Sequence, residues 1–159
     1  MFSIFQKKKE VSLTSCINGA QIPLCEVKDD VFASSMMGEG VAFALQDDVI
    51  YAPCDGLITL IPASLHAIGI QAENGAEILI HVGLDTVSLE GKGFQPLIKQ
   101  GDKIKRGDSL LRVDRQAIKE KGIDLTTMMI ITNSKDYQID ITMHEDVRVS
   151  DQVMICKKI

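Results

Sequence analysis

The sequence has 159 residues, 45% hydrophobic and 25% charged, with a formal net charge of −5 and a pI near 5.1. This length is enough for one compact domain with a hydrophobic core, whereas two full domains would be a tight fit. The acidic balance argues against nucleic acid as a partner, because its phosphates demand a basic face. With no Trp and few aromatic residues, the core must consist of Ile, Leu, Val, Met and Ala.

The first residues place apolar Phe2, Ile4 and Phe5 before a run of lysines that ends at Lys9. A signal peptide has the opposite order and a longer apolar stretch, and no run approaches the roughly 20 residues of a membrane span. We therefore expect a cytoplasmic protein with a flexible arm over residues 1–19 and a single domain over residues 20–159. The arm would make at most a peripheral contact with a membrane surface.

The four cysteines are scattered along the chain and show neither C-x-x-C spacing nor clustering with histidines. Zinc ligands usually occur in such clusters. Scattered cysteines in a chain without a signal peptide favour free thiols over disulfides.

From about residue 20 onward, short runs rich in Ile, Leu and Val alternate with turns that carry Gly, Asp, Asn or Pro. The runs cover residues 41–45, 57–61, 67–72, 77–82, 109–113, 128–132 and 152–156. This spacing predicts an all-β fold, an antiparallel β-sandwich or flattened barrel. One helix is predicted over residues 115–121, ended by Gly122, so the fold has one or two short helices.

Asn74 and Gly75 give the clearest hairpin signal, because both residues readily adopt the conformations of tight turns. The strand after this turn contains His81, and alternation places His81 on the face opposite the apolar residues that can fill the core. Counted outward from the turn, His66 is eight positions back and His81 is six positions on. The offset of two allows neighbouring side chains across the ladder, which predicts that the two histidines share one patch.

A pair of imidazoles on an apolar surface suits a phosphoryl acceptor. Neutral imidazole is nucleophilic near pH 7, and the N–P bond that it forms retains high transfer potential. The transition state is loose, so the protein mainly positions the group and donates hydrogen bonds to its oxygens. His66 can be such a donor, and the Ser64 hydroxyl can fix its tautomer. We expect no cofactor and no required metal.

Residues 75–87 read Gly-Ala-Glu-Ile-Leu-Ile-His-Val-Gly-Leu-Asp-Thr-Val. They resemble the active-site signature of the glucose-family enzyme IIA domains (EIIA) of the bacterial phosphoenolpyruvate-dependent sugar phosphotransferase system. Residues 31–40, 51–56 and 64–70 resemble further segments of that family in the same order. The resemblance covers the chain from about residue 22 to the C-terminus.

The resemblance implies a β-sandwich of the duplicated hybrid motif type. It also implies that the phosphoryl group passes from the phosphohistidine of HPr to His81, as a tele-phosphohistidine, and then to a cysteine on the IIB domain of a sugar permease. His66 corresponds to the family's phosphoryl-stabilising histidine, and Ser64 takes the place of a family hydroxyl residue that is usually Thr. The resemblance also allows regulated permeases or kinases as further partners. It further allows an intermolecular zinc site at His66 and His81 that a partner's carboxylate would complete.

The resemblance also implies a docking face for partner proteins. Asp29 and Asp85 would meet basic residues of the partners, and the apolar part of the face would comprise Val31, Phe32, Met37, Ile68, Leu79 and Val87.

Two other functions are alternatives. A zinc hydrolase on a related β-sandwich needs an H-x-H pair, which this chain lacks. A regulatory binding module without phosphotransfer would use the same apolar face, and a phosphorylation assay separates it from a carrier. His144 lies in a polar, turn-like stretch and is predicted to be a loop residue without a catalytic role.

Overall fold

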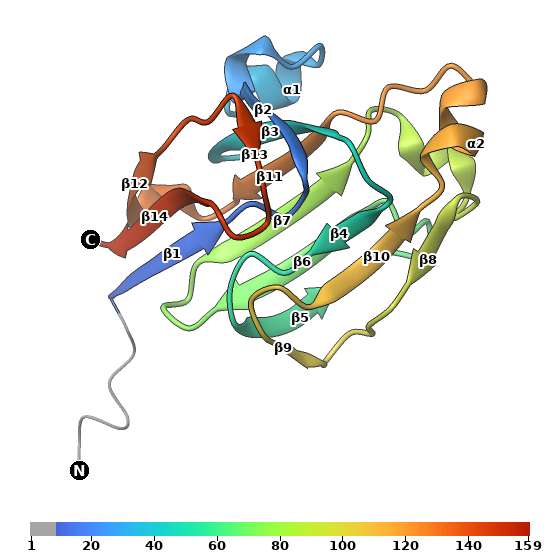
Figure 1. The fold of residues 1–159 in the computed structure, drawn as a ribbon. Helices are drawn as coiled ribbons and strands as arrows, with labels where there is room; N and C mark the ends of the chain where they lie inside the picture. Colours follow the sequence, from blue (N-terminus) through green and yellow to red (C-terminus); the bar gives the residue numbers. More distant parts are fainter. Residues whose placement is uncertain (1–8) are drawn as a thin grey trace.

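The computed structural model describes residues 9–159, which form three antiparallel sheets and two short α-helices (Figure 1). The helices are α1 (Asp30–Ala33) and α2 (Arg115–Glu120). The strands are β1 (Glu10–Thr14), β2 (Gly19–Pro23), β3 (Glu39–Leu45), β4 (Val49–Tyr51), β5 (Gly56–Leu60), β6 (Ala67–Ala72), β7 (Glu77–Val82), β8 (Phe94–Pro96), β9 (Lys103–Ile104), β10 (Ser109–Val113), β11 (Thr127–Ile131), β12 (Tyr137–Ile141), β13 (Asp146–Val147) and β14 (Gln152–Lys158).

The largest sheet has eight strands in the order β13-β2-β3-β11-β7-β6-β5-β9, and two three-stranded sheets have the orders β1-β14-β12 and β4-β10-β8. All three sheets contribute to one core. The inner face of the large sheet supplies residues such as Ile78 and Ile80, while Leu110 of β10 and Met154 of β14 come from the small sheets. The predicted all-β antiparallel fold with short helices is therefore confirmed.

The N-terminal boundary differs from the predicted arm over residues 1–19. Residues 10–14 form β1, which pairs with β14, and residues 19–23 form β2 of the large sheet. Leu13, Cys16 and Ile17 are fully buried in the core, so burial of apolar surface holds this segment in place. Residues 1–8, and with them the predicted membrane contact of Phe2, Ile4 and Phe5, lie outside the described residues.

The turn between β6 and β7 is one residue longer than a two-residue Asn-Gly turn. The loop comprises Glu73, Asn74 and Gly75, with Gly75 at a φ of +87° and its N–H donating to the Ala72 carbonyl at 3.0 Å. This is the three-residue hairpin pattern that ends in a left-handed glycine. The pairing consequently shifts by one position, and Ala67 lies opposite His81.

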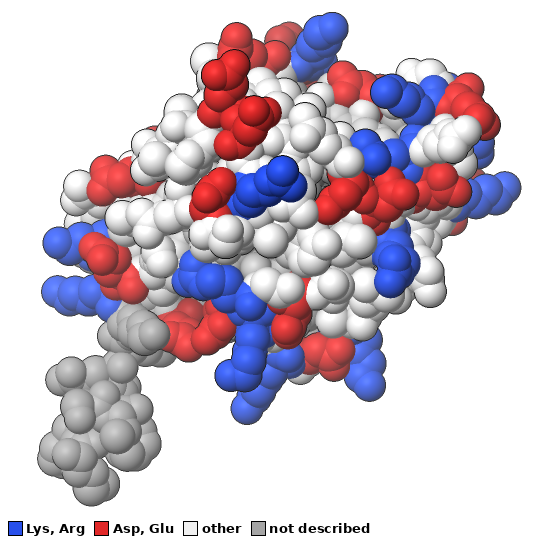
Figure 2. All heavy atoms as spheres, viewed as in Figure 1, with Lys and Arg blue, Asp and Glu red and all other residues white. Residues whose placement is uncertain are grey.

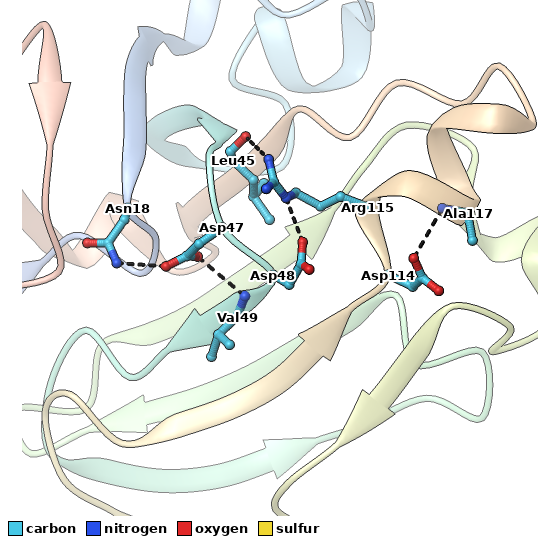
Figure 3. A network of polar contacts seen from close by, with 8 residues as sticks. All are labelled: Asn18, Leu45, Asp47, Asp48, Val49, Asp114, Arg115 and Ala117. Carbon is cyan, nitrogen blue, oxygen red and sulfur yellow. Dashed lines mark hydrogen bonds and ion pairs between the residues drawn. The ribbon is translucent and has the colours of Figure 1, made fainter.

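A polar network fastens α2 to the loop between β3 and β4 (Figure 3). Arg115 donates to the Asp48 carboxylate at 2.6 Å and to the Leu45 carbonyl at 3.1 Å, while Asp47 accepts from Asn18 at 2.8 Å. The Arg115–Asp48 pair is largely exposed, so it contributes little to stability and mainly sets the position of the helix. On the side seen in Figure 2, charges of both signs are interspersed, and no broad basic area appears there.

Candidate functional site

His81 lies on the outer face of the large sheet, as the alternation along β7 predicts. Ile78, Ile80 and Val82 are buried, whereas Leu79 and His81 are half-buried. The pairing aligns His81 with Ala67 of β6 and with Met128 of β11, which in turn lies opposite Ala42 of β3. The histidine thus stands in a row of apolar residues across four strands.

Helix α1 covers part of this face and brings an aromatic ring against His81. Asp29 caps the helix, because its Oδ1 accepts from the Val31 N–H at 2.9 Å. The Phe32 ring then lies 5.0 Å from the His81 ring, centroid to centroid. Phe32 belongs to a second apolar cluster that is separate from the main core and is formed by Leu24, Val27, Phe32, Ala42, Met128 and Ile130. One side of the imidazole is therefore shielded from water.

The structure brings His66 and His81 together, with ring centroids 5.1 Å apart and ring planes at 78°. The contact does not arise from the predicted offset of two. His66 directly precedes β6, and its carbonyl accepts from the Val82 N–H at 2.7 Å. His66 therefore lies opposite Val82, one position beyond the pair formed by Ala67 and His81. Side chains one position apart in a regular ladder point to opposite faces. The rings meet because the chain leaves the regular strand at Leu65, which has a φ of +58°.

The tautomer of His81 follows from its hydrogen bond. Nδ1 lies 2.9 Å from the Gly83 carbonyl oxygen. A carbonyl can only accept, so Nδ1 carries the proton in the neutral ring and the lone pair is on Nε2. Gly83 has a φ of +84°, and a Cβ there would overlap the Cγ2 of Thr86. The sequence signal for this acceptor was the glycine two positions after the histidine.

Ser64 is the polar partner of His66. The Ser64 hydroxyl and Nδ1 of His66 are 2.5 Å apart. When the hydroxyl donates, it occupies the Nδ1 lone pair and leaves the imidazole proton on Nε2. In that form His66 can donate a hydrogen bond through Nε2.

Burial lowers the pKa of both imidazoles below the ordinary value of 6.5. For His81 the proximity of His66 lowers the pKa further, while the Gly83 carbonyl and the Asp29 carboxylate act in the opposite direction. Both rings therefore remain neutral at neutral pH, which is the nucleophilic form.

The predicted docking residues divide into three groups. Val31, Met37, Asp85 and Val87 are exposed, with Val87 at 58%. Asp29 and Leu79 are half-buried, and Phe32 is buried against His81. The placement of Ile68 on this face is wrong, because Ile68 is 1% exposed and lies opposite Ile80 on the core side. Side chains alternate along β6, so the residues on the outer face are its neighbours Ala67 and Gly69, which lie opposite His81 and Leu79.

Sequence reasoning missed an apolar residue on this face, Leu60. The register of β5 shifts between Ile58 and Leu60, so that Ile58 lies opposite Ile70 on the core side and Leu60 lies opposite Gly69. Gly69 in turn lies opposite Leu79. The bulge rotates Leu60 to the outer face, where it is 47% exposed. A bulge leaves no signal in the apolar pattern of the strand.

A groove of about 540 Å³ lies away from the histidines, where β5 begins and β6 ends. Leu57 and Ile104 line it together with Lys103 and Lys105, and neither histidine does. In the described part of the chain, no three His, Cys, Asp or Glu side chains gather as a metal site would require. The site is thus an imidazole pair on an open apolar face.

His144 belongs to neither feature. Its backbone N–H donates to Gln21 at 3.0 Å, and its Nε2 lies 2.8 Å from the Gln152 carbonyl. These contacts fasten the loop before β13 to neighbouring strands, which accounts for the residue structurally.

Residues 11–137 match the family model described as phosphoenolpyruvate-dependent sugar phosphotransferase system, EIIA 1. The chain belongs to this EIIA family. The resemblance carried by residues 75–87 is thereby confirmed, and the protein is a glucose-family EIIA phosphocarrier component of that system.

Individual relatives agree with this assignment. The EIIA chain is 47% identical over 135 residues to the "PTS system glucose-specific EIIA component" of Oceanobacillus iheyensis, an alignment that covers 84% of this chain and 82% of the relative. The solved glucose permease IIA from Mycoplasma capricolum superposes with a TM-score of 0.87 at 34% identity, over 93% of this chain and 96% of the other.

Some relatives are much longer. The EIIA chain is 40% identical over 149 residues to the "PTS system beta-glucoside-specific EIIBCA component" of Halalkalibacterium halodurans, of which the alignment covers 23%. In residues 9–159 of the chain itself, no helix has both the length and the apolar character needed to cross a membrane.

Proposed function

We propose that Nε2 of His81 is the atom that accepts and releases the phosphoryl group. The observation that carries this proposal is the Nδ1 contact with the Gly83 carbonyl, which leaves the Nε2 lone pair free. In the forward step, the N–P bond of phospho-HPr breaks as a bond forms between phosphorus and Nε2, while the proton on Nδ1 stays in place.

We further propose that His66 stabilises the transferring group. Its ring is 5.1 Å from that of His81, and Ser64 leaves its Nε2–H available as a donor. Donors held in place before the reaction stabilise the charge on the equatorial oxygens without reorganisation. No metal or cofactor is needed for this role.

The apolar face around the histidines is proposed as the docking surface for two proteins in turn. HPr is the donor, and a cysteine on the IIB domain of a sugar permease is the acceptor, to which the phosphoryl group passes as the Nε2–P bond breaks and an S–P bond forms. Relatives whose names combine EIIA with B and C components support the IIB assignment. The unpaired cysteines are in keeping with a reducing compartment, the cytoplasm.

Regulation by contact is a second candidate function. Val31 and Val87 are exposed, and Val31 adjoins Phe32, whose ring contacts His81. Such an apolar surface can bind a permease or a kinase without phosphotransfer. A carboxylate of that partner would complete a zinc site with His66 and His81.

The test is incubation with enzyme I, HPr and labelled phosphoenolpyruvate. Wild type and His144→Ala should both acquire stable, acid-labile label, and His81→Ala should acquire none. His144→Ala is the matched control because it also removes an imidazole from the chain. Label retained by His81→Ala would exclude His81 as the acceptor, and an unlabelled wild type would favour the contact regulator.

A further inference from the structure

The peptide that joins Gly83 to Leu84 is hydrogen-bonded on both sides. Its carbonyl accepts from Nδ1 of His81 at 2.9 Å, and its N–H donates to the carbonyl of Asp124 at 2.8 Å. The carbonyl and N–H of a trans peptide point in opposite directions within one plane. The bond to Asp124 therefore sets the direction in which the Gly83 carbonyl faces His81.

The preceding peptide is held by the same segment. The Gly83 N–H donates to the Thr126 carbonyl at 3.0 Å. Both peptide planes next to the Gly83 α-carbon are thus fixed by carbonyls of residues 124–126. This restraint matters because glycine has no side chain to limit its torsions, and Gly83 holds a φ of +84°.

The side chain of Asp124 shapes the segment that supplies these carbonyls. Its Oδ1 accepts from the backbone N–H of Thr126 at 2.8 Å and from the Thr126 hydroxyl at 2.7 Å. An aspartate that bonds the backbone two residues on closes a local turn. Without the carboxylate this turn loses both bonds, and the two carbonyls lose that restraint.

We propose that Asp124 is a positioning residue that keeps His81 in the Nδ1–H tautomer, acting through Thr126 and the Gly83–Leu84 peptide. In metal-binding histidines, a carbonyl that accepts from the second ring nitrogen fixes the tautomer in the way that the Gly83 carbonyl does for His81. The consequence for phosphotransfer rests on the proposed role of His81 Nε2, because only the Nδ1–H tautomer carries a lone pair there.

The experiment is ¹⁵N NMR of the imidazole nitrogens in the unphosphorylated protein at neutral pH. Wild type should show His81 as a single Nδ1–H tautomer, and Asp124→Ala should show a clearly populated Nε2–H form. The initial rate of phosphorylation by phospho-HPr should fall about fivefold in Asp124→Ala, the effect of losing roughly one hydrogen bond, that between Nδ1 of His81 and the Gly83 carbonyl. Asp124→Asn keeps an acceptor oxygen and should restore the wild-type tautomer.

Asp108→Ala is the matched control. Asp108 also accepts from a backbone N–H within a turn, that of Lys105 at 2.8 Å, but it lies between β9 and β10. This variant should leave the His81 tautomer unchanged.

Should Asp124→Ala fail to fold, Thr126→Val removes only the hydroxyl bond and should give the same tautomer change to a smaller extent. A pure Nδ1–H tautomer in the folded variants would overturn the proposal. Because the NMR signal needs no partner protein, this outcome is distinct from a failure of His81 to accept phosphate.

Discussion

The imidazole rings of His66 and His81 meet edge to face, with centroids 5.1 Å apart and an interplanar angle of 78°. Their hydrogen-bond partners differ in kind. Nδ1 of His81 donates to a carbonyl, whereas Nδ1 of His66 lies against the hydroxyl of Ser64. Nε2 of His81 therefore carries a lone pair, whereas Nε2 of His66 carries a proton when the Ser64 hydroxyl is the donor.

His66→Gln should separate the two halves of the carrier cycle. We expect it to accept phosphate from HPr, because the His81 nucleophile is intact. Onward transfer to a IIB domain should fall by roughly a hundredfold, because the Gln amide does not hold its N–H where the imidazole holds the transition-state donor. Rapid-quench measurement of both steps checks this, with His144→Gln as the control. Equal onward rates in wild type and His66→Gln would show that His66 is only structural.

The lowered pKa values of His66 and His81 predict a loss of stability in acid. Burial lowers both pKa values in the folded state, so the unfolded chain takes up protons first as the pH falls. The contribution of these two imidazoles to the free energy of unfolding should therefore be constant above the unfolded pKa of about 6.5 and should decrease below it. Urea denaturation between about pH 8 and about pH 5 measures this. The double variant His66→Gln/His81→Gln should show a weaker pH dependence in that window, and an unchanged one would contradict the assignment.

Gly83→Ala should destabilise the protein more than backbone strain alone explains. Gly83 and Gly107 have φ values of +84° and +88°, but a Cβ at Gly107 meets nothing within 4 Å, whereas one at Gly83 overlaps Thr86. Gly107→Ala should cost about 1 kcal/mol from strain, and Gly83→Ala about 3 kcal/mol because the clash adds to it. Chemical denaturation of both variants compares them directly. Equal losses would mean that Thr86 moves aside without cost.

Val87→Glu tests the docking face without touching the histidines. Val87 is 58% exposed, so the folded monomer should tolerate the change. Loss of one apolar contact and burial of a charge should raise the KM for phospho-HPr about tenfold or more. Leu97→Glu is the matched control, since Leu97 is 38% exposed and follows β8 in another sheet. A rise of KM in both variants alike would argue against a localised docking face.

The cysteines should differ in reactivity in the native protein. Cys25 is exposed, whereas Cys16, Cys54 and Cys156 are buried. Burial raises the pKa of each of these three thiols to about 12, so they remain protonated and unreactive. Titration with a thiol reagent at mildly alkaline pH should modify one cysteine in the native protein and four in guanidinium chloride. Rapid modification of a second thiol would show that the core opens readily.

Local sequence patterns were sufficient to predict features that depend on a single strand or helix. Alternation along β7 correctly placed His81 on the other face of the strand from Ile78, Ile80 and Val82, because successive side chains alternate whatever the partner strand is. The helix predicted at residues 115–121 was found as Arg115–Glu120, with Asp114 as its cap and Gly122 at a φ of +76°. The segment before residue 20 was misjudged, since β1 is short and gains its stability from pairing with β14 at the other end of the chain.

The sequence by itself determined the family, the strand-rich fold and the two histidines, because these depend on residue identity, order and periodicity. Only the tertiary structure decided how the histidines are arranged. A three-residue turn and a left-handed Leu65 bring the rings together, a bulge rotates Leu60 outward, and Asp124 reaches His81 through the Gly83–Leu84 peptide. These relationships depend on turn length, register and contacts between distant segments, which are set by the packing of the whole chain and leave no local pattern.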